Sequence, residues 1–248
     1  MSKHISAGPD KDVASMAHSA RGASRKLALL SDETRTAALL AIADALEGNG
    51  QRILAANAKD CAAAEHFLST GEMTPALFSR LRIKENGIAE MADRVREVAN
   101  LSDPLGKLLA ATELDEGLIL QKESCPLGVI AVVFESRPDV VPQVASLALK
   151  SGNAVLLKGG AEAANSSECI VGIWKETLCK FPDIPPGSLQ LLQSRSDVME
   201  LLGLHGEVDL LIPRGSKEFV AFMGKNSRIP VLATARESAT CSSIARRT

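Results

Sequence analysis

The stretch PLGVIAVVFESRPDVVPQVASLALKSGNAVLLKGGAEAAN, residues 126–165, decides how this chain folds. Residues 129–134 form an apolar, largely β-branched run of the kind found in a strand buried on both faces. After a polar turn, residues 140–150 place apolar side chains at helical spacing. Residues 151–153 contain a glycine of the kind that ends a helix, and residues 154–157 resemble a second buried strand. The stretch therefore predicts a strand–helix–strand unit with two parallel strands.

Turns of unusual composition follow three of the predicted strands, at residues 135–139, 158–162 and 213–216. Each turn carries a cation: Arg137, Lys158 and Arg214. In open α/β sheets, ligands bind beyond the carboxyl ends of the strands. Glycine in the last two turns lets the backbone approach a ligand, and the helix that follows offers free N–H groups to a phosphate. The alternative is that these are ordinary connections, but three of them at corresponding positions favour a binding site.

The rest of the chain predicts an α/β fold. The first hundred residues have the pattern of helices with polar outer faces, and residues 107–125 have the pattern of a short hairpin. After residue 126 strands alternate with helices, which is typical of a parallel, doubly wound sheet. The common dinucleotide fingerprint GxGxxG and the phosphate-binding motif GxxxxGK[ST] are both absent from the sequence.

Composition narrows the class of protein. Of the 248 residues 46% are hydrophobic and 3% aromatic, so the core is aliphatic, and the net charge of -2 gives no case for nucleic acid or an anionic membrane. No apolar run approaches the roughly 20 residues that span a bilayer. The N-terminus has no apolar signal core, which predicts a cytoplasmic protein, with a mitochondrial location as the alternative. The five cysteines and four histidines lack metal-ligand spacing, so we expect free thiols and no metal site.

Five segments together resemble one family of enzymes. They read PLGVI, FESRPDVV, LALKSGNAVLLKGG, IPPGSLQL and DLLIPRGS. In this order and spacing they resemble γ-glutamyl phosphate reductase, also called glutamate-5-semialdehyde dehydrogenase, of the aldehyde dehydrogenase superfamily. The resemblance extends from about residue 10 to Leu232. The chain is also similar to the reductase half of pyrroline-5-carboxylate synthase, but it has no kinase half.

The resemblance implies an aldehyde-dehydrogenase-like α/β fold in which N-terminal helices accompany a Rossmann-like parallel sheet that binds the cofactor. We divide the chain into a helical N-terminal part (1–106), a β-hairpin (107–125), a Rossmann-like dinucleotide-binding part (126–232) and a tail outside the family pattern (233–248). In the family the hairpin makes oligomer contacts, so a homo-oligomer is expected for the full-length member.

The implied reaction is the NADPH-dependent reduction of γ-glutamyl phosphate to glutamate 5-semialdehyde and phosphate, the second step of proline synthesis from glutamate. A cysteine thiolate displaces phosphate to give a thioester, and hydride from the cofactor reduces that thioester. Backbone N–H groups stabilise the oxyanion. The expected partners are therefore a small-molecule substrate and NADP.

The resemblance also implies roles for individual residues. Lys158, followed by Gly159 and Gly160, matches the superfamily lysine that meets the adenosine ribose. Gly215 and Ser216 match the turn before the helix that faces the pyrophosphate.

A third group of residues matches the loop between cofactor and substrate: Glu135, Ser136, Arg137 and Pro138. Arg137 either binds a carboxylate or phosphate of the substrate, or forms a structural ion pair with Asp139 or Glu135. Ala161 occupies the position of an acid in many NAD-selecting relatives, which leaves room for a 2′-phosphate. Close relatives often have lysine at this position, so Ala161 departs from the family pattern.

The tail lacks the family's reactive cysteine. Residues 233–248 read ATARESATCSSIARRT, where the family has a segment resembling GHADGICHVYVD. Reading permitted codons for the tail one base out of register gives GHGAGICHVFID, so we expect a frameshift at about Leu232. The nucleophile and the catalytic domain would then be missing, and Cys241 would not be the nucleophile. A genuine alternative C-terminus and a pseudogene product are the alternatives.

Two other functions remain open at this point. One is a nucleotide-binding remnant or scaffold that carries out no chemistry. The other is an aldehyde dehydrogenase for a different acyl donor, although the Arg137-Pro138 turn, in place of the superfamily's usual Pro-Trp-Asn, argues against it.

Overall fold

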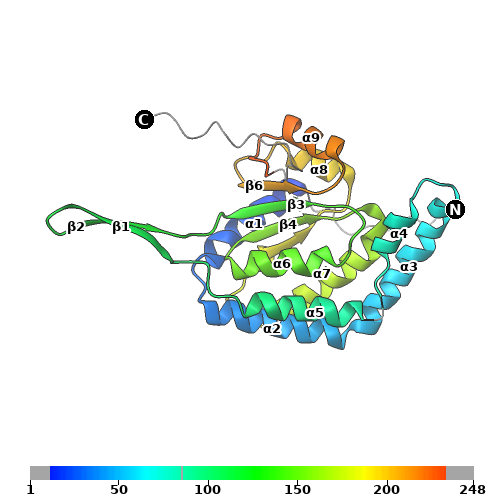
Figure 1. Cartoon of the computed structure of the whole chain (residues 1–248), viewed down its shortest axis with the longest axis horizontal. Helices are drawn as coiled ribbons and strands as arrows, with labels where there is room; N and C mark the ends of the chain where they lie inside the picture. The colour runs from blue at the N-terminus through cyan, green and yellow to red at the C-terminus, as the bar shows by residue number, and fades with distance from the viewer. Residues whose placement is uncertain (1–11, 85, 233–248) are drawn as a thin grey trace.

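A four-stranded parallel sheet forms the centre of the computed structural model, which describes residues 12–84 and 86–232 (Figure 1). The strands lie in the order β5-β4-β3-β6. Their bounds are β3 Val129–Val133, β4 Ala154–Lys158, β5 Leu189–Leu191 and β6 Leu210–Pro213. All pairings within this sheet are parallel, as the alternation of strands and helices predicts.

The register of the sheet brings three strand ends together. Val133, the last residue of β3, pairs with Lys158 on one side and with Pro213 on the other. These three residues are the last of their strands. The turns that carry the resemblance therefore start next to one another at one edge of the sheet.

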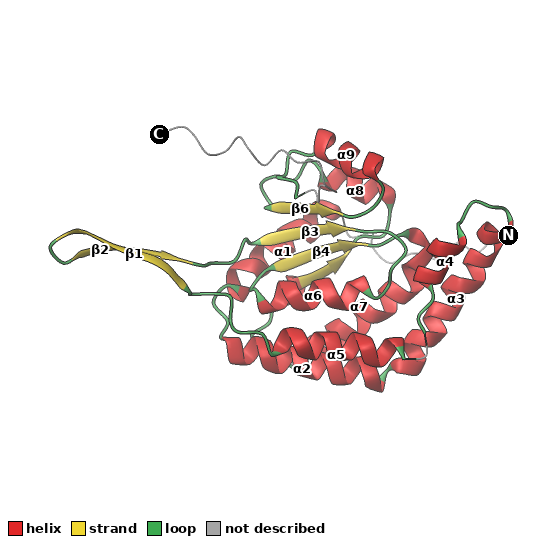
Figure 2. Ribbon diagram, viewed as in Figure 1, coloured by secondary structure: helices red, strands yellow, loops and turns green. Residues whose placement is uncertain are grey.

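Helices pack against the sheet and then against each other. The helices α6 and α7 lie between the sheet and a second helical layer that contains α2 and α5 (Figure 2). Helix α1 packs on β3, β4 and β5, and α3 packs along α7. The bounds are α1 Val13–Leu27, α2 Asp32–Gly48, α3 Gly50–Ser69, α4 Pro75–Leu81, α5 Gly87–Ala99, α6 Val140–Lys150, α7 Ala164–Leu178, α8 Arg195–Leu201 and α9 Lys217–Asn226.

The N-terminal helices and the sheet share one large hydrophobic core, which includes Leu39 of α2, Val95 of α5 and Trp174 of α7. A smaller cluster lies around α4 and the end of α3 and consists of Ala64, Met73, Leu81 and Ala163. The helices of the N-terminal part therefore pack in the same body as the sheet. The division of the chain at residue 106 remains a prediction from the sequence.

Several element boundaries differ from those that the sequence pattern predicts, and three of them are instructive. The pattern predicts a helix from Gln51 to about Ala64, whereas α3 continues to Ser69 through residues 65–69, which contain no glycine or proline to end it. The apolar pattern predicts a short helix from Val198 to Leu202, whereas α8 begins at Arg195, because Ser194 and Asp197 form a capping box that starts the helix earlier. The apolar run predicts a strand from Val208 to Ile212, whereas β6 covers Leu210–Pro213.

A two-stranded antiparallel hairpin extends away from the body (Figure 1). It consists of β1 Leu108–Asp115 and β2 Leu118–Glu123, and the turn uses Gly117 at a φ of 76°. Every residue of both strands is exposed. Large apolar side chains are among them: Leu108, Leu109, Leu114, Leu118, Ile119 and Leu120.

None of the helices within residues 12–84 and 86–232 combines the length and the apolarity needed to cross a membrane.

Candidate functional site

Backbone hydrogen bonds hold the three strand-end turns against one another. The N–H of Phe134 donates to the carbonyl of Lys158 over 2.9 Å, and the N–H of Arg214 donates to the carbonyl of Val133 over 2.7 Å. The sheet ladder thus continues one residue past the ends of β3 and β6. The turn residues that follow lie at one edge, where parallel α/β proteins bind ligands.

Glu162 links the second turn to the first. Its Oε1 accepts the backbone N–H of Ser136 over 2.9 Å and also accepts the Ser136 hydroxyl. Ser136 is 4% exposed and has a φ of 30°, an uncommon backbone conformation for a residue with a side chain. A Cβ at position 160 would lie 2.1 Å from the same Oε1, so glycine is needed there for Glu162 to fold back toward Ser136.

Glu135 links the first turn to the third. A Cβ at position 215 would lie 2.8 Å from Oε1 of Glu135, so Gly215 makes room for this carboxylate. Helix α9 begins directly after this turn, and Ser216 caps it by accepting the N–H of Phe219 over 3.2 Å. The positive end of the α9 dipole therefore lies beside the turn.

Lys158 is only 9% exposed, and its ammonium donates to the carbonyl of Gly159. Burial lowers the pKa of this lysine, while the nearby carboxylates of Glu162 and Asp197 act in the opposite direction. The ammonium of Lys158, at the end of β4, can donate hydrogen bonds to a ligand bound at the carboxyl ends of the strands.

Arg137 is held by Asp139. Its Nη2 lies 2.7 Å from Oδ2 of Asp139 and its Nε lies 3.2 Å from Oδ1, a two-pronged pair. This hydrogen bonding raises the pKa of Arg137 above its usual value. Asp139 also accepts from Arg94 over 3.5 Å and from Gln143 over 3.4 Å. Of the two alternatives left open by the sequence, the structure contains the ion pair with Asp139.

A cavity of about 660 Å³ opens beside the first and third turns. Apolar side chains of β3, β6 and α6 line part of it. The polar residues of its lining include Arg80, Glu135, Arg137 and Arg214. Gly215 also lies in this lining. Three of these four side chains are cationic, so the cavity suits an anionic ligand with an apolar segment.

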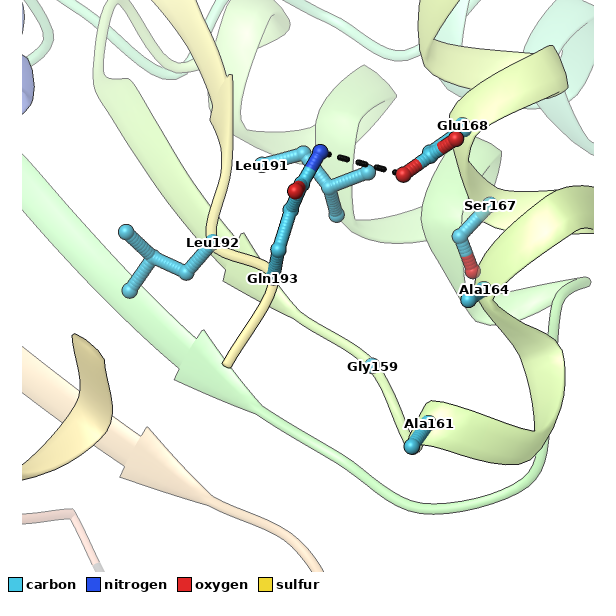
Figure 3. Close-up of a pocket in the computed structure, with 9 residues that line it drawn as sticks. Gly159, Ala161, Ala164, Ser167, Glu168, Leu191, Leu192 and Gln193 are labelled. Carbon is cyan, nitrogen blue, oxygen red and sulfur yellow. Dashed lines mark hydrogen bonds between the residues drawn. The ribbon is translucent and has the colours of Figure 1, made fainter. Parts of the chain in front are cut away.

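A second, much smaller cavity of about 30 Å³ lies beside the second turn (Figure 3). Gly159, Gly160 and Ala161 line one side, and residues 191–193 line another. Gln193 donates from Nε2 to Glu168 over 3.0 Å across this region (Figure 3). The residues expected to hold the cofactor are thus divided: Gly159 and Gly160 line this cavity, whereas Gly215 lines the larger one.

Residues that the sequence did not single out also belong to the site. Glu162 joins two turns, Asp197 of α8 lies near Lys158, and Arg80 of α4 reaches the large cavity. Glu162 could have been found, since it is an acid in the quoted turn. Arg80 and Asp197 carry no local signal, because only the packing of α4 and α8 brings them to this edge.

The thiols of the described residues lie elsewhere. Cys125 and Cys179 are exposed, while Cys61 and Cys169 are partly buried. Burial raises the pKa of both Cys61 and Cys169, which keeps them protonated. In the described ranges, no cysteine lines the two cavities beside the turns. Cys241, together with the rest of residues 233–248, falls outside the part of the chain that the structure describes.

Comparisons with known proteins show which proteins this chain is similar to. Residues 1–230 match the model of the aldehyde dehydrogenase family. The chain is 46% identical over 222 residues to a gamma-glutamyl phosphate reductase of Methanosarcina barkeri, an alignment that covers 90% of this chain and 50% of that protein. It is 44% identical over 228 residues to a protein of the same name from Synechococcus, with 92% and 50% covered.

Solved structures of proteins with the same name are also similar to this chain. A gamma-glutamyl phosphate reductase from Thermotoga maritima superposes with a TM-score of 0.85 at 32% identity, covering 90% of this chain and 53% of that one. The protein of that name from Saccharomyces cerevisiae gives a TM-score of 0.84 at 37% identity, covering 94% and 57%. The chain spans about half the length of the curated relatives it matches.

Proposed function

Because this chain belongs to the aldehyde dehydrogenase family, whose members use NAD(P), we propose that it is the dinucleotide-binding part of an NADPH-dependent γ-glutamyl phosphate reductase. The reaction of the whole enzyme would be the reduction of γ-glutamyl phosphate to glutamate 5-semialdehyde and phosphate. The substrate follows from the names of relatives that are 46% and 44% identical across most of this chain.

The observation that carries this proposal is the meeting of the three strand-end turns at one edge of a parallel sheet. Lys158 would donate to hydroxyls of the adenosine ribose, and the start of α9 at Gly215 and Ser216 would face the pyrophosphate. Ala161 is small enough to leave space for a 2′-phosphate, which supports NADP over NAD. Support for such a ligand comes from the buried cation Lys158 and the N-terminus of α9, which adjoin the same edge of the sheet.

When bound, the cofactor would supply the hydride. The chain's own residues would bind and orient the substrate: Arg80 and Arg214 line the large cavity and bring positive charge to it, which suits the phosphate and carboxylate of γ-glutamyl phosphate. Arg137 lines the same cavity while paired with Asp139. The N–H of Ser136 already donates to Glu162, so Ser136 would act in positioning rather than as an oxyanion donor.

We also propose that the 248-residue chain binds the dinucleotide without carrying out the reduction. The thiols of the described residues lie away from the turns, and the relatives are about twice as long. The second candidate, a non-catalytic nucleotide-binding module, is favoured by the same placement of the thiols. A cytoplasmic location is proposed for a biosynthetic enzyme of this kind, and self-association through the exposed hairpin is proposed for the full-length enzyme.

Activity in the reverse direction tests this proposal. The purified chain is incubated with glutamate 5-semialdehyde, phosphate and NADP, and absorbance of NADPH is followed. We expect no formation of NADPH by the 248-residue chain, and phosphate-dependent formation by a chain extended through the shifted reading frame. Phosphate-dependent activity of the 248-residue chain would contradict the proposal.

The nucleotide sequence across codon 232 separates the two candidates. An open frame that continues through Gly-Ile-Cys-His supports the reductase, whereas a stop confirmed after Thr248 supports the module without chemistry.

A further inference from the structure

The N-terminus of α7 follows directly after the glycine turn that ends β4, separated from it only by a short 3-10 segment, Ala161–Ala163. In phosphate-binding α/β proteins a helix end in this place takes the anionic part of the ligand. In this chain the position is filled by the protein itself. The carboxylate of Asp60, from the middle of α3, reaches the first turn of α7.

Asp60 makes four hydrogen bonds there. Oδ1 accepts the backbone N–H of Asn165 over 3.1 Å and its side-chain amide over 2.8 Å. Oδ2 accepts the backbone N–H of Ser166 over 2.8 Å and its hydroxyl over 2.5 Å. These donors are all uncharged, so the helix dipole and the hydrogen bonds stabilise a carboxylate that is only 3% exposed.

The N-cap residue of α7 is Ala163, which has no side-chain acceptor and makes no side-chain cap. The cap comes instead from a residue 105 positions earlier in the chain. A buried carboxylate with two backbone N–H donors at a helix N-terminus has the same charge and contacts as a bound anion.

Asn57, one turn before Asp60 on α3, extends the contact to a third segment. Its Nδ2 donates to the hydroxyl of Ser166 over 3.1 Å and to the carbonyl of Leu81 over 2.9 Å. Its Oδ1 accepts the N–H of Ile83 over 2.8 Å. Leu81 is the neighbour of Arg80, which lines the large cavity. Asn57 and Asp60 therefore hold the start of α7 and the end of α4 relative to each other.

We propose that Asp60 is a positioning residue that permanently occupies the anion site at the start of α7. The pyrophosphate of the dinucleotide is then directed to α9, and the turn from Lys158 to Glu162 is anchored at both ends, by β4 and by Asp60. The part of this inference that concerns the cofactor rests on the proposed function, whereas the occupied anion site does not.

Chemical rescue tests the occupied site without any cofactor. Asp60→Ala should lower the melting temperature by roughly 5 °C or more, since a buried cap is lost in a chain of this size. Formate, which restores a carboxylate to the vacated position, should recover part of the loss, and sodium chloride at the same ionic strength should not. The control is Glu65→Ala, an exposed carboxylate on the same helix, whose melting temperature should not respond to formate. Equal responses of Asp60→Ala to formate and chloride would overturn the occupied site.

Cofactor affinity tests the positioning role. At a temperature where each variant is folded, Asp60→Ala should raise the dissociation constant for NADPH about tenfold. Asp209→Ala, which breaks a contact at the opposite end of β3, should lose stability but keep the wild-type dissociation constant. An unchanged dissociation constant in Asp60→Ala would overturn the positioning role, and Asp60→Asn is measured in its place if the alanine variant does not fold.

Failure of the wild-type chain to bind NADPH would instead contradict the proposed function, and the formate experiment would still decide whether Asp60 occupies an anion site.

Discussion

Gly160 is the residue on which the connection between the first two turns depends most directly. The Gly160→Ala substitution places a Cβ 2.1 Å from the present position of Oε1 of Glu162. The flexible Glu162 side chain would move away, and the buried N–H of Ser136 would lose its acceptor. We expect a loss of about 1–3 kcal/mol in the free energy of unfolding, measured by urea denaturation.

The matched control is Gly206→Ala. Nothing lies within 4 Å of a Cβ at position 206, so this variant should stay within about 0.5 kcal/mol of wild type. Equal stabilities of the two variants would show that the hydrogen bond between Glu162 and the N–H of Ser136 does not require glycine at position 160.

Asp209 gives the stability a specific dependence on pH. It accepts from Arg21 over 2.9 Å and from the N–H of Val129 over 2.8 Å. Burial alone would raise its pKa, but these hydrogen bonds outweigh burial, so the pKa is lowered. A carboxyl with a lowered folded-state pKa stabilises the fold fully above its unfolded-state pKa of about 3.9 and loses this contribution as pH falls through the folded-state pKa.

Asp209→Ala should therefore cost about 1–3 kcal/mol near neutral pH, because the N–H of Val129 loses its acceptor. The difference from wild type should shrink as pH falls below about 4. Urea denaturation of wild type and Asp209→Ala from neutral pH to below about 4 measures this difference in the free energy of unfolding. A difference that grows toward acidic pH would contradict a lowered pKa of Asp209 in the folded protein.

At the scale of single residues, the sequence predicted the turns but not their partners. Lys158, Gly215 and the loop at Glu135 could be found because a run of apolar residues ends just before each of them. Asp60 could not be found, because an acid on a helix carries no sign of which other helix it caps. The role of Glu162 also depends on the unusual φ of Ser136, which local sequence does not reveal.

At the scale of elements, one lysine joins three helices. Lys150, the last residue of α6, is 3% exposed. Its ammonium lies 2.7 Å from Asp32 of α2, and it donates to Thr36 over 2.9 Å and to the carbonyl of Ala99, at the end of α5, over 3.0 Å. Lys150→Ala should cost about 1–3 kcal/mol, because the carbonyl of Ala99 loses this buried donor. Asp32 keeps Arg35 at 3.8 Å and is one-third exposed, so its own loss is smaller.

The control for this prediction is Lys107→Ala, an exposed lysine whose loss should change stability by no more than about 0.5 kcal/mol. Guanidinium denaturation followed by circular dichroism measures both variants. A Lys150→Ala protein as stable as the control would show that the second helical layer is held by apolar packing alone.

The hairpin should be dispensable for the fold of the body. Its residues are all exposed and its two strands pair only with each other. Replacing residues 109–121 with a short glycine-serine link should leave the melting temperature within a few degrees of wild type. Because six large apolar side chains are exposed on the hairpin, the shortened chain should also self-associate less, as measured by analytical ultracentrifugation. A large loss of stability would contradict this account of the hairpin.

Most elements could be predicted from the sequence, because continuous apolar runs marked the strands, helical patterns were clear, and caps such as Ser31 and Thr74 lie at helix starts. The order of the strands could not be predicted, because burial on both faces looks the same for β3 and β4. The start of α8 was missed because its first turn is polar, and the apolar pattern begins only at Val198.

At the scale of the whole molecule, one core joins the helical layers to the sheet, while one side of the site remains open to solvent. Apolar residues of β3, β6 and α6 line the large cavity together with three arginines. The curated relatives are about twice as long as this chain, which spans about half of their length. We therefore expect the edge of the sheet to bind the dinucleotide on its own, and the chemistry to require more protein than this chain contains.

The dissociation constant for NADPH, measured by fluorescence titration of the 248-residue chain, tests the central claim most directly. Saturable binding is expected, with a dissociation constant at least about tenfold higher in Lys158→Ala. Arg25→Ala, at a cavity beside α1 and residues 206–209, is the control and should bind as wild type does. Absence of binding by the wild-type chain, or equal affinity in Lys158→Ala, would contradict a dinucleotide site at the ends of these strands.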